Sequence, residues 1–221
     1  YPVGETPLVE GQDRTGRAAP KRIPVNARRS YSVPDATAQL EAAQYKQANT
    51  IISPPVLLQY PINEPYLQRV ADTYASLVHQ PDNPEVARAY NALISETALQ
   101  YEAMGSDLRV EPWREEGEPY AGSEEMLVDV RDNRHLFFFL TESGFEGGEN
   151  NANHPMLAPS AYRAVDGSVL LNNDIFRIVH DYFGHAPNGL SFGPVGEFNA
   201  FMSHATMYTP EAVPALASET L

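Results

Sequence analysis

The chain contains no cysteine among its 221 residues. Disulfide bonds and thiolate metal sites are therefore excluded, and the redox compartment in which the protein works is left open. No apolar run approaches the length that crosses a bilayer, and no apolar block follows a basic start as it does in a signal peptide. We therefore expect no membrane span and no secretion signal in this chain.

Basic residues are also scarce, since 15 Lys and Arg stand against 29 Asp and Glu, for a net charge of −14. Residues 1–50 hold seven of the basic residues and five of the acids, so the remainder carries 8 basic and 24 acidic residues. A body this acidic repels nucleic-acid phosphates, so we do not expect nucleic acid to bind it. The basic start suits DNA or an acidic protein surface.

Composition divides the chain into an arm, residues 1–50, and a globular domain, residues 51–221. The arm is rich in Pro, Gly and Arg and lacks periodicity up to Pro34, after which Asp35 is placed to cap a short helix. We expect the arm to lie extended on a protein partner, with a plain disordered tail as the alternative. The first residue is Tyr1 rather than Met, from which we expect processing or a longer parent protein.

The domain pattern predicts a mainly α fold with a small β element (α+β). Apolar residues at three- and four-residue spacing predict helices at Glu64–His79 and Pro84–Met104, which we expect to pack as an antiparallel pair in the core. Strands are expected at Leu108–Trp113, Met126–Val130 and His135–Leu140, the last two forming a hairpin. The Gly-rich residues 142–153 form either a lid over a site or a surface loop.

The segment Asn172–His185 carries the main functional motif, because it places two histidines near one helix end. Apolar residues repeat at helical spacing up to Phe183, and the Asn and Asp residues at its start can cap the helix. His180 and His185 are five residues apart, which on an α-helix of about 3.6 residues per turn turns their side chains about 140° apart. We expect Gly184 to end the helix in a left-handed conformation and so to bring both imidazoles to one metal ion.

Two imidazoles need a carboxylate partner, because non-haem ferrous oxygenases hold their iron with two His and one carboxylate. Downstream of His185 the acids are Glu197, Glu211 and Glu219. The first two stand where the helix dipole explains an acid at the start of a helix. Glu219 has no such explanation, so we choose it as the third ligand to the iron, with Glu197 as second choice.

The run His180-Asp181-Tyr182-Phe183-Gly184-His185-Ala186-Pro187, with a later Glu, resembles the metal-binding segment of the biopterin-dependent aromatic amino acid hydroxylases. Its residues are also similar to a hydroxylase-like segment of very large phage-encoded polyvalent proteins. The resemblance covers roughly Leu170 to Leu221. It implies a hydroxylase-like core that is incomplete at its C-terminus, with His180, His185 and Glu219 as ligands to Fe(II). A pterin and an aromatic substrate are implied by the resemblance alone.

The function expected from these residues is that of an iron-dependent monooxygenase acting on a small molecule. Asp181 would orient one imidazole through its second ring nitrogen. His204 is a further participant or ligand, or else a buried helix residue. Three alternatives stay open: a phage virion or interaction protein that keeps the scaffold, a metal-dependent hydrolase, and two histidines that merely close a loop. The location expected is cytoplasmic or virion-associated.

Overall fold

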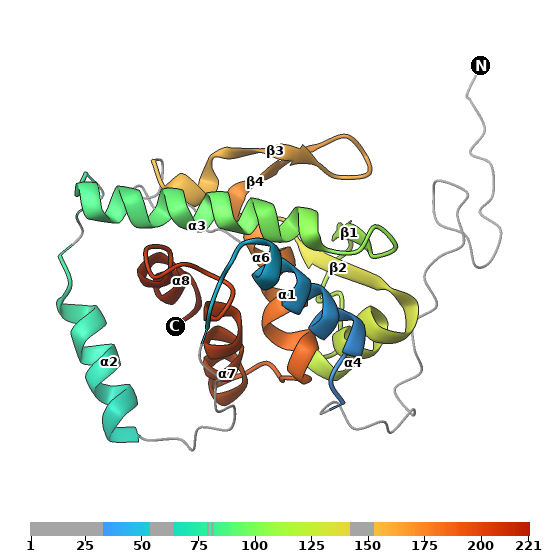
Figure 1. Cartoon of the computed structure of the whole chain (residues 1–221), viewed down its shortest axis with the longest axis horizontal. Helices are drawn as coiled ribbons and strands as arrows, with labels where there is room; N and C mark the ends of the chain where they lie inside the picture. The colour runs from blue at the N-terminus through green and yellow to red at the C-terminus, as the bar shows by residue number, and fades with distance from the viewer. Residues whose placement is uncertain (1–32, 54–63, 79, 81, 142–152) are drawn as a thin grey trace.

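The computed structural model describes residues 33–53, 64–78, 80, 82–141 and 153–221. These residues form a mainly helical fold with two small sheets, as the composition and periodicity predicted (Figure 1). The α-helices are α1 (Ala36–Ala48), α2 (Glu64–Ser76), α3 (Pro84–Ala103), α4 (Ser123–Val128), α6 (Asn172–Val179), α7 (Pro194–Ala205) and α8 (Val213–Thr220). The strands are β1 (Arg109–Trp113), β2 (His135–Phe139), β3 (Pro159–Arg163) and β4 (Val169–Leu171). Two π-helical turns, η1 (Asp129–Asn133) and η3 (His180–His185), and two 3-10 turns, η2 (Pro155–Leu157) and η4 (Ala186–Asn188), complete the described elements.

The first sheet corrects one of the predictions. Strands β1 and β2 lie where the sequence predicted them, but they pair in parallel, with Arg109 opposite His135 and Trp113 opposite Phe139. Parallel strands need a crossover between them rather than a hairpin turn. The segment Met126–Val130, predicted as the first hairpin strand, supplies that crossover as the end of α4 and the start of η1. Its apolar side chains are buried, so the short apolar run that suggested a strand is one buried helical turn.

Helix α6 and the turn η3 that continues it form the centre of the fold. Their apolar side chains repeat at helical spacing, and the buried ones are Ile175, Phe176, Ile178, Val179, Tyr182 and Phe183. Helix α6 packs against α3 and β2, while η3 packs against α7. This burial on several sides fixes the path of the backbone that carries both histidines of the sequence motif.

A buried carboxylate holds the start of α6. Asp174, at 2% exposure, accepts a hydrogen bond from the Leu171 amide at 2.7 Å and two from the amide and hydroxyl of Thr141, at 2.7 and 2.6 Å. These three hydrogen bonds satisfy the buried carboxylate, and the one from Leu171 also satisfies an otherwise unpaired amide at the helix start. Asp174 is therefore the residue that caps the helix, out of the three candidates at its start, Asn172, Asn173 and Asp174.

Helix α1 belongs to this body although the composition assigned it to the arm. Asp35 caps it as predicted, accepting hydrogen bonds from the amides of Thr37 and Ala38 at 2.8 and 3.3 Å. Its inner face, which includes Tyr45, lies in the main apolar core, and its start bonds to η4 through the Asp35 amide and the Ala186 carbonyl at 2.9 Å. The rest of the predicted arm, residues 1–32, lies outside the described residues.

Helices α2 and α3 form close to the predicted bounds but do not pack together as a core pair. Helix α3 buries Leu93 and Thr97 against the body, whereas nearly all described side chains of α2 are exposed. Figure 1 shows α2 standing away from α3 at the edge of the fold. Periodicity predicted both helices correctly, but it did not indicate which apolar face would be covered.

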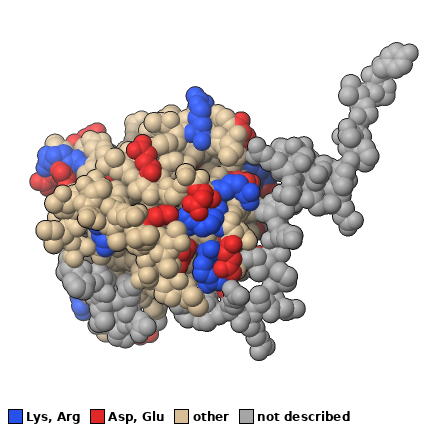
Figure 2. Space-filling model, turned by 45° about the vertical axis from the view of Figure 1, so that its right-hand side comes forward, with Lys and Arg blue, Asp and Glu red and all other residues tan. Residues whose placement is uncertain are grey.

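Charges of both signs are interspersed on the face shown in Figure 2, where acidic side chains (red) lie next to basic ones (blue). The ion pairs among the described residues include Arg109 with Glu111 at 3.0 Å. No helix in the part of the chain that the structure describes combines the length and the apolar character of a membrane span.

Candidate metal centre

His180 and His185 occupy the first and last positions of the π-helical turn η3. A π-helix bonds residue i to residue i+5, so its wider turn brings side chains five apart onto the same side. The prediction that Gly184 would end the helix in a left-handed conformation is therefore wrong, since Gly184 has no positive φ and the backbone runs on through η4 to Gly189, where φ is 63° and ψ 40°. The two imidazoles converge because the helix widens before it ends.

Gly184 serves the site by leaving room. A Cβ atom at this position would lie 3.1 Å from Nδ1 and 3.2 Å from Cε1 of His180. Contacts this short are tighter than ordinary van der Waals packing, so an alanine would push against the imidazole. Glycine is thus favoured here by the ring beside it, and not by the backbone conformation.

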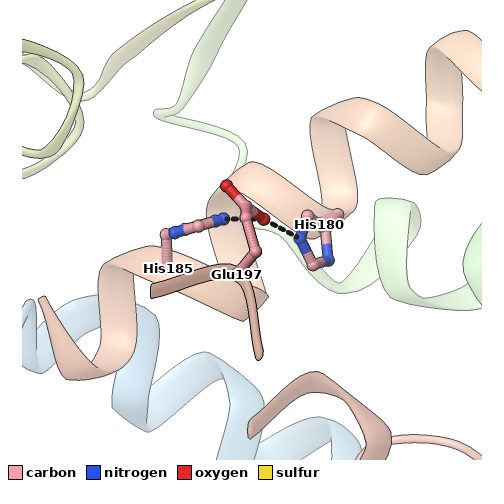
Figure 3. A group of neighbouring side chains, drawn as sticks. All are labelled: His180, His185 and Glu197. Carbon is pink, nitrogen blue, oxygen red and sulfur yellow. Dashed lines mark hydrogen bonds and ion pairs between the residues drawn. The ribbon is translucent and has the colours of Figure 1, made fainter. Parts of the chain in front are cut away.

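Glu197 is the third member of the site. It lies in the first turn of α7, and its Oε2 is 3.4 Å from Nε2 of His180 and 3.3 Å from Nε2 of His185. Figure 3 shows its carboxylate between the two rings. One ligand atom from each of the three side chains lies within 4.8 Å of the other two, so the group could hold a metal ion. With metal–ligand bonds of about 2.0–2.2 Å, two ligands at 90° to 109° are about 2.8 to 3.6 Å apart, which both distances satisfy.

A second glycine allows α7 to approach this closely. A Cβ atom on Gly196 would lie 1.6 Å from the backbone carbonyl oxygen of Ser191, which no side chain could tolerate. The first turn of α7 is therefore pressed against the loop that follows η4, and Glu197 is carried to the histidines. The helix dipole also favours an acid at this position, which is why the sequence alone did not single it out.

Glu219, the first choice for the third ligand, does not join the group. Its Oε1 accepts a hydrogen bond from the Tyr90 hydroxyl at 2.6 Å and lies 3.7 Å from Nε2 of His154. Helix α8 packs against α3, so its late acid is used at that contact and the metal group found among the described residues contains Glu197 instead. The second choice replaces the first because η3 packs against α7.

The second ring nitrogen of His185 is held by the backbone. Its Nδ1 lies 3.1 Å from the carbonyl oxygen of Leu190. A carbonyl only accepts, so Nδ1 carries the proton and Nε2 of the neutral ring carries the lone pair. That Nε2 atom is buried, has no hydrogen-bond partner among the described residues, and faces the Glu197 carboxylate. The nitrogen lone pair and the carboxylate oxygen, held face to face, are stabilised by a cation between them, either a proton or a metal ion.

Asp181 does not have the orienting role that the sequence suggested. The Nδ1 atoms of His185 and His180 are bonded to the Leu190 carbonyl and to His204, so neither imidazole bonds to Asp181 through its second nitrogen. Burial raises the pKa of Asp181, against the opposing influence of His185 and His180. Its carboxyl therefore acts on the site through space.

The charges of the site favour a bound cation. Burial by itself would raise the pKa of Glu197, but its contacts with His180 and His185 outweigh this and lower the pKa to about 2. Burial would lower the pKa of His185, but the contact with Glu197 and the charge of Asp181 raise it. A carboxylate that is ionised at neutral pH, beside imidazole nitrogens, is the donor set that divalent metals bind.

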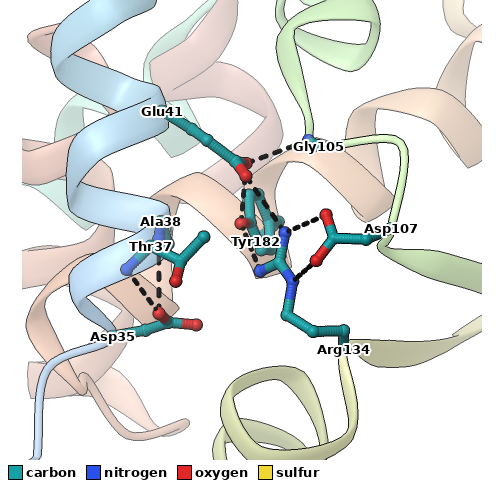
Figure 4. Close-up of polar contacts among 8 residues, drawn as sticks. All are labelled: Asp35, Thr37, Ala38, Glu41, Gly105, Asp107, Arg134 and Tyr182. Atoms are coloured by element: carbon teal, nitrogen blue, oxygen red, sulfur yellow. Dashed lines mark hydrogen bonds and ion pairs between the residues drawn. The ribbon is translucent and has the colours of Figure 1, made fainter.

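Tyr182, between the two histidines in sequence, anchors η3 through a network of polar contacts (Figure 4). Its hydroxyl accepts a hydrogen bond from Arg134 at 2.8 Å and donates one to Glu41 at 2.8 Å. Arg134 also bonds to Glu41 at 3.0 Å and to Asp107 at 2.9 Å. This network joins η3 to α1 and to the turn before β2, and its members gave no recognisable sequence pattern because they are far apart in the chain.

Comparison of the chain with protein-family models, with curated proteins and with solved structures gave no match. The site is therefore interpreted from its own geometry.

Proposed function

We propose that this chain is a non-haem Fe(II)-dependent oxygenase in which His180, His185 and Glu197 hold the iron. The observation that carries the proposal is the convergence of two imidazole nitrogens and one carboxylate oxygen within 4.8 Å of one another. Two His and one carboxylate on one face of the metal, with the other positions open, is the ligand set of non-haem ferrous oxygenases. The hydroxylase-like segment supports the same chemistry, and it alone suggests an aromatic substrate and a pterin.

The residues around the site divide it into a closed and an open side. The side chains of His180 and His185 are 10% and 1% exposed, whereas that of Glu197 is 35% exposed. The ring of Phe176 stacks on His180 at 5.8 Å between centroids, and that of Phe192 meets His185 edge-on at 5.2 Å. The protein therefore excludes water from the imidazoles and leaves access beside the carboxylate.

Ferrous iron bound here would supply dioxygen activation at about three remaining coordination positions. The chain supplies one negative charge, from Glu197, and two neutral nitrogens, so a divalent ion keeps a net positive charge toward the open side. Phe192, which is 41% exposed, lies at the edge of His185 and offers an apolar surface to a small-molecule substrate.

A zinc-dependent hydrolase is the second candidate, and Asp181 is the observation that favours it. Two His and one Glu with an open position also form catalytic zinc sites. The Asp181 carboxyl interacts electrostatically with His185, His180 and Glu197, so an acid does stand beside the ligands. The interaction-protein alternative depends on the N-terminal arm, of which residues 1–32 lie outside the described residues.

The test compares Glu197→Gln with Glu219→Gln after anaerobic reconstitution with Fe(II). We expect about one iron per chain in the wild type and in Glu219→Gln, and at least a tenfold weaker affinity for iron in Glu197→Gln, since a liganding charge is lost. Bound metal is measured by elemental analysis, and dioxygen uptake is followed with a panel of aromatic substrates.

Three outcomes would count against the proposal. Wild-type protein that retains no iron has no such site, and equal losses in the two variants would mean that Glu197 is not a ligand. Stoichiometric zinc with no dioxygen uptake in the iron-loaded protein would favour the hydrolase.

A further inference from the structure

An imidazole can bind a metal through Nε2 only if its single proton is held on Nδ1. For His185 the Leu190 carbonyl ensures this. For His180 the partner of Nδ1 is another ring nitrogen, Nδ1 of His204, at 3.2 Å. A ring nitrogen can donate or accept, so this contact alone does not decide which of the two atoms carries the proton.

Gln100 on α3, which contacts His204, decides which of the two nitrogens carries the proton. The Gln100 amide nitrogen lies 3.3 Å from the backbone carbonyl of Met207, which can only accept. The amide group must therefore turn its oxygen the other way, and Oε1 of Gln100 lies 2.8 Å from Nε2 of His204. Nε2 of His204 must carry a proton to make this bond, so Nδ1 of the neutral ring is an acceptor.

We propose that Gln100 and His204 form a relay, running from Met207 to His180, that holds the proton of His180 on Nδ1 and so frees its Nε2 for the metal. The effect of the relay on metal binding rests on the proposed function. The inference adds two positioning residues to the site. Gln100 and His204 are both 0% exposed, so no solvent competes for their hydrogen-bonding groups. The relay joins α3 to η3 and α7, which come much later in the chain.

Reversing the relay would disable the site without removing any ligand. If Gln100 offered no acceptor, His204 could place its proton on Nδ1, facing His180. His180 would then accept that hydrogen bond and carry its own proton on Nε2, where the metal has to bind. Partners that orient a ligating histidine typically change metal affinity by about 10- to 100-fold when they are replaced.

The first measurement needs no metal. Long-range proton–nitrogen NMR correlations on the labelled metal-free protein at about pH 9, where an ordinary histidine is neutral, report which nitrogen carries the proton. We expect His180 and His185 to be protonated on Nδ1 and His204 on Nε2. A neutral His180 protonated on Nε2 would overturn the relay, whatever the protein binds.

The second measurement compares Gln100→Met with Thr97→Val by Co(II) titration. Methionine keeps the shape of Gln100 but removes the acceptor, so we expect His180 to move its proton to Nε2 and Co(II) affinity to fall about 10- to 100-fold. Thr97 is the control, because it is buried on the same helix and its hydroxyl bonds to the Tyr208 hydroxyl, at 2.7 Å, rather than to Gln100, His204 or His180. Thr97→Val should keep both the wild-type tautomers and the wild-type affinity.

Failure of the relay and failure of the metal site give different results. If wild-type protein binds neither Co(II) nor Fe(II) but shows the expected tautomers, the proposed function fails and the hydrogen-bond relay stands. If wild-type protein binds Co(II) and Gln100→Met binds it equally well with unchanged tautomers, the relay is refuted and the metal site stands.

Discussion

The exchange Gly184→Ala tests directly how the π-helical turn accommodates its first histidine. The added Cβ would lie 3.1 Å from Nδ1 and 3.2 Å from Cε1 of His180, and 3.6 Å from the Cβ of Ala200. The imidazole is confined on its other sides by His204, Glu197 and the stacked ring of Phe176. It must therefore shift by a few tenths of an ångström, away from the position that faces the other ligands.

Two energies oppose each other in this variant. Alanine in place of a helical glycine stabilises a helix by up to about 1 kcal/mol. Overpacking at a close contact typically costs about 1–3 kcal/mol. We therefore expect the free energy of unfolding to fall by between about 0 and 3 kcal/mol. If the overpacking cost instead appears only when metal binding fixes the position of His180, it weakens metal binding. At 1.4 kcal/mol per tenfold, the loss in affinity is about 5- to 150-fold.

The assay is Co(II) titration together with urea unfolding, and the control is Gly167→Ala. Gly167 lies in the turn between β3 and β4 with φ of 85° and no atom near its missing Cβ, so alanine there costs about 1–2 kcal/mol of backbone strain without touching the site. We expect weaker Co(II) binding in Gly184→Ala only. Wild-type affinity in Gly184→Ala, or an equal loss in both variants, would refute the argument that this glycine makes room for the ring.

Further predictions concern the network that anchors η3 and the pH dependence of stability. Tyr182→Phe removes the hydrogen bonds of the hydroxyl to Arg134 and Glu41, so urea unfolding should show a loss of about 2 kcal/mol, and a change below 0.5 kcal/mol would contradict the anchoring role. Burial would raise the pKa of Asp129, but hydrogen bonds, first of all with His135, lower it below its usual value. A lowered pKa in the folded state adds stability above the unfolded value, about pH 4, which is lost as the pH falls through the folded pKa. We expect stability to drop below about pH 4 in the wild type and by a smaller amount in Asp129→Asn, because Glu197, with its lowered pKa, still contributes its own share, as followed by urea unfolding at a series of pH values.

The helices could be predicted from the sequence because their causes are local. Asp35 caps α1, and the apolar spacing of α6 marks its buried face, as the pattern indicated. The pairing of β1 with β2 could not be predicted in this way. Parallel pairing depends on the crossover through α4 and η1, and a short apolar run fits a buried helical turn as well as a strand.

The sequence by itself determined that two histidines lie near one helix end with acids downstream, because both facts are matters of residue type and spacing. Only the tertiary structure decided that η3 widens into a π-helix, that Glu197 rather than Glu219 completes the group, and that His204 stands behind His180. The physical reason is that an acid at a helix start and an acid late in a helix each have a sufficient local explanation. Which carboxylate reaches the imidazoles depends on how α7 packs against η3, at the contact that Gly184 and Gly196 make possible.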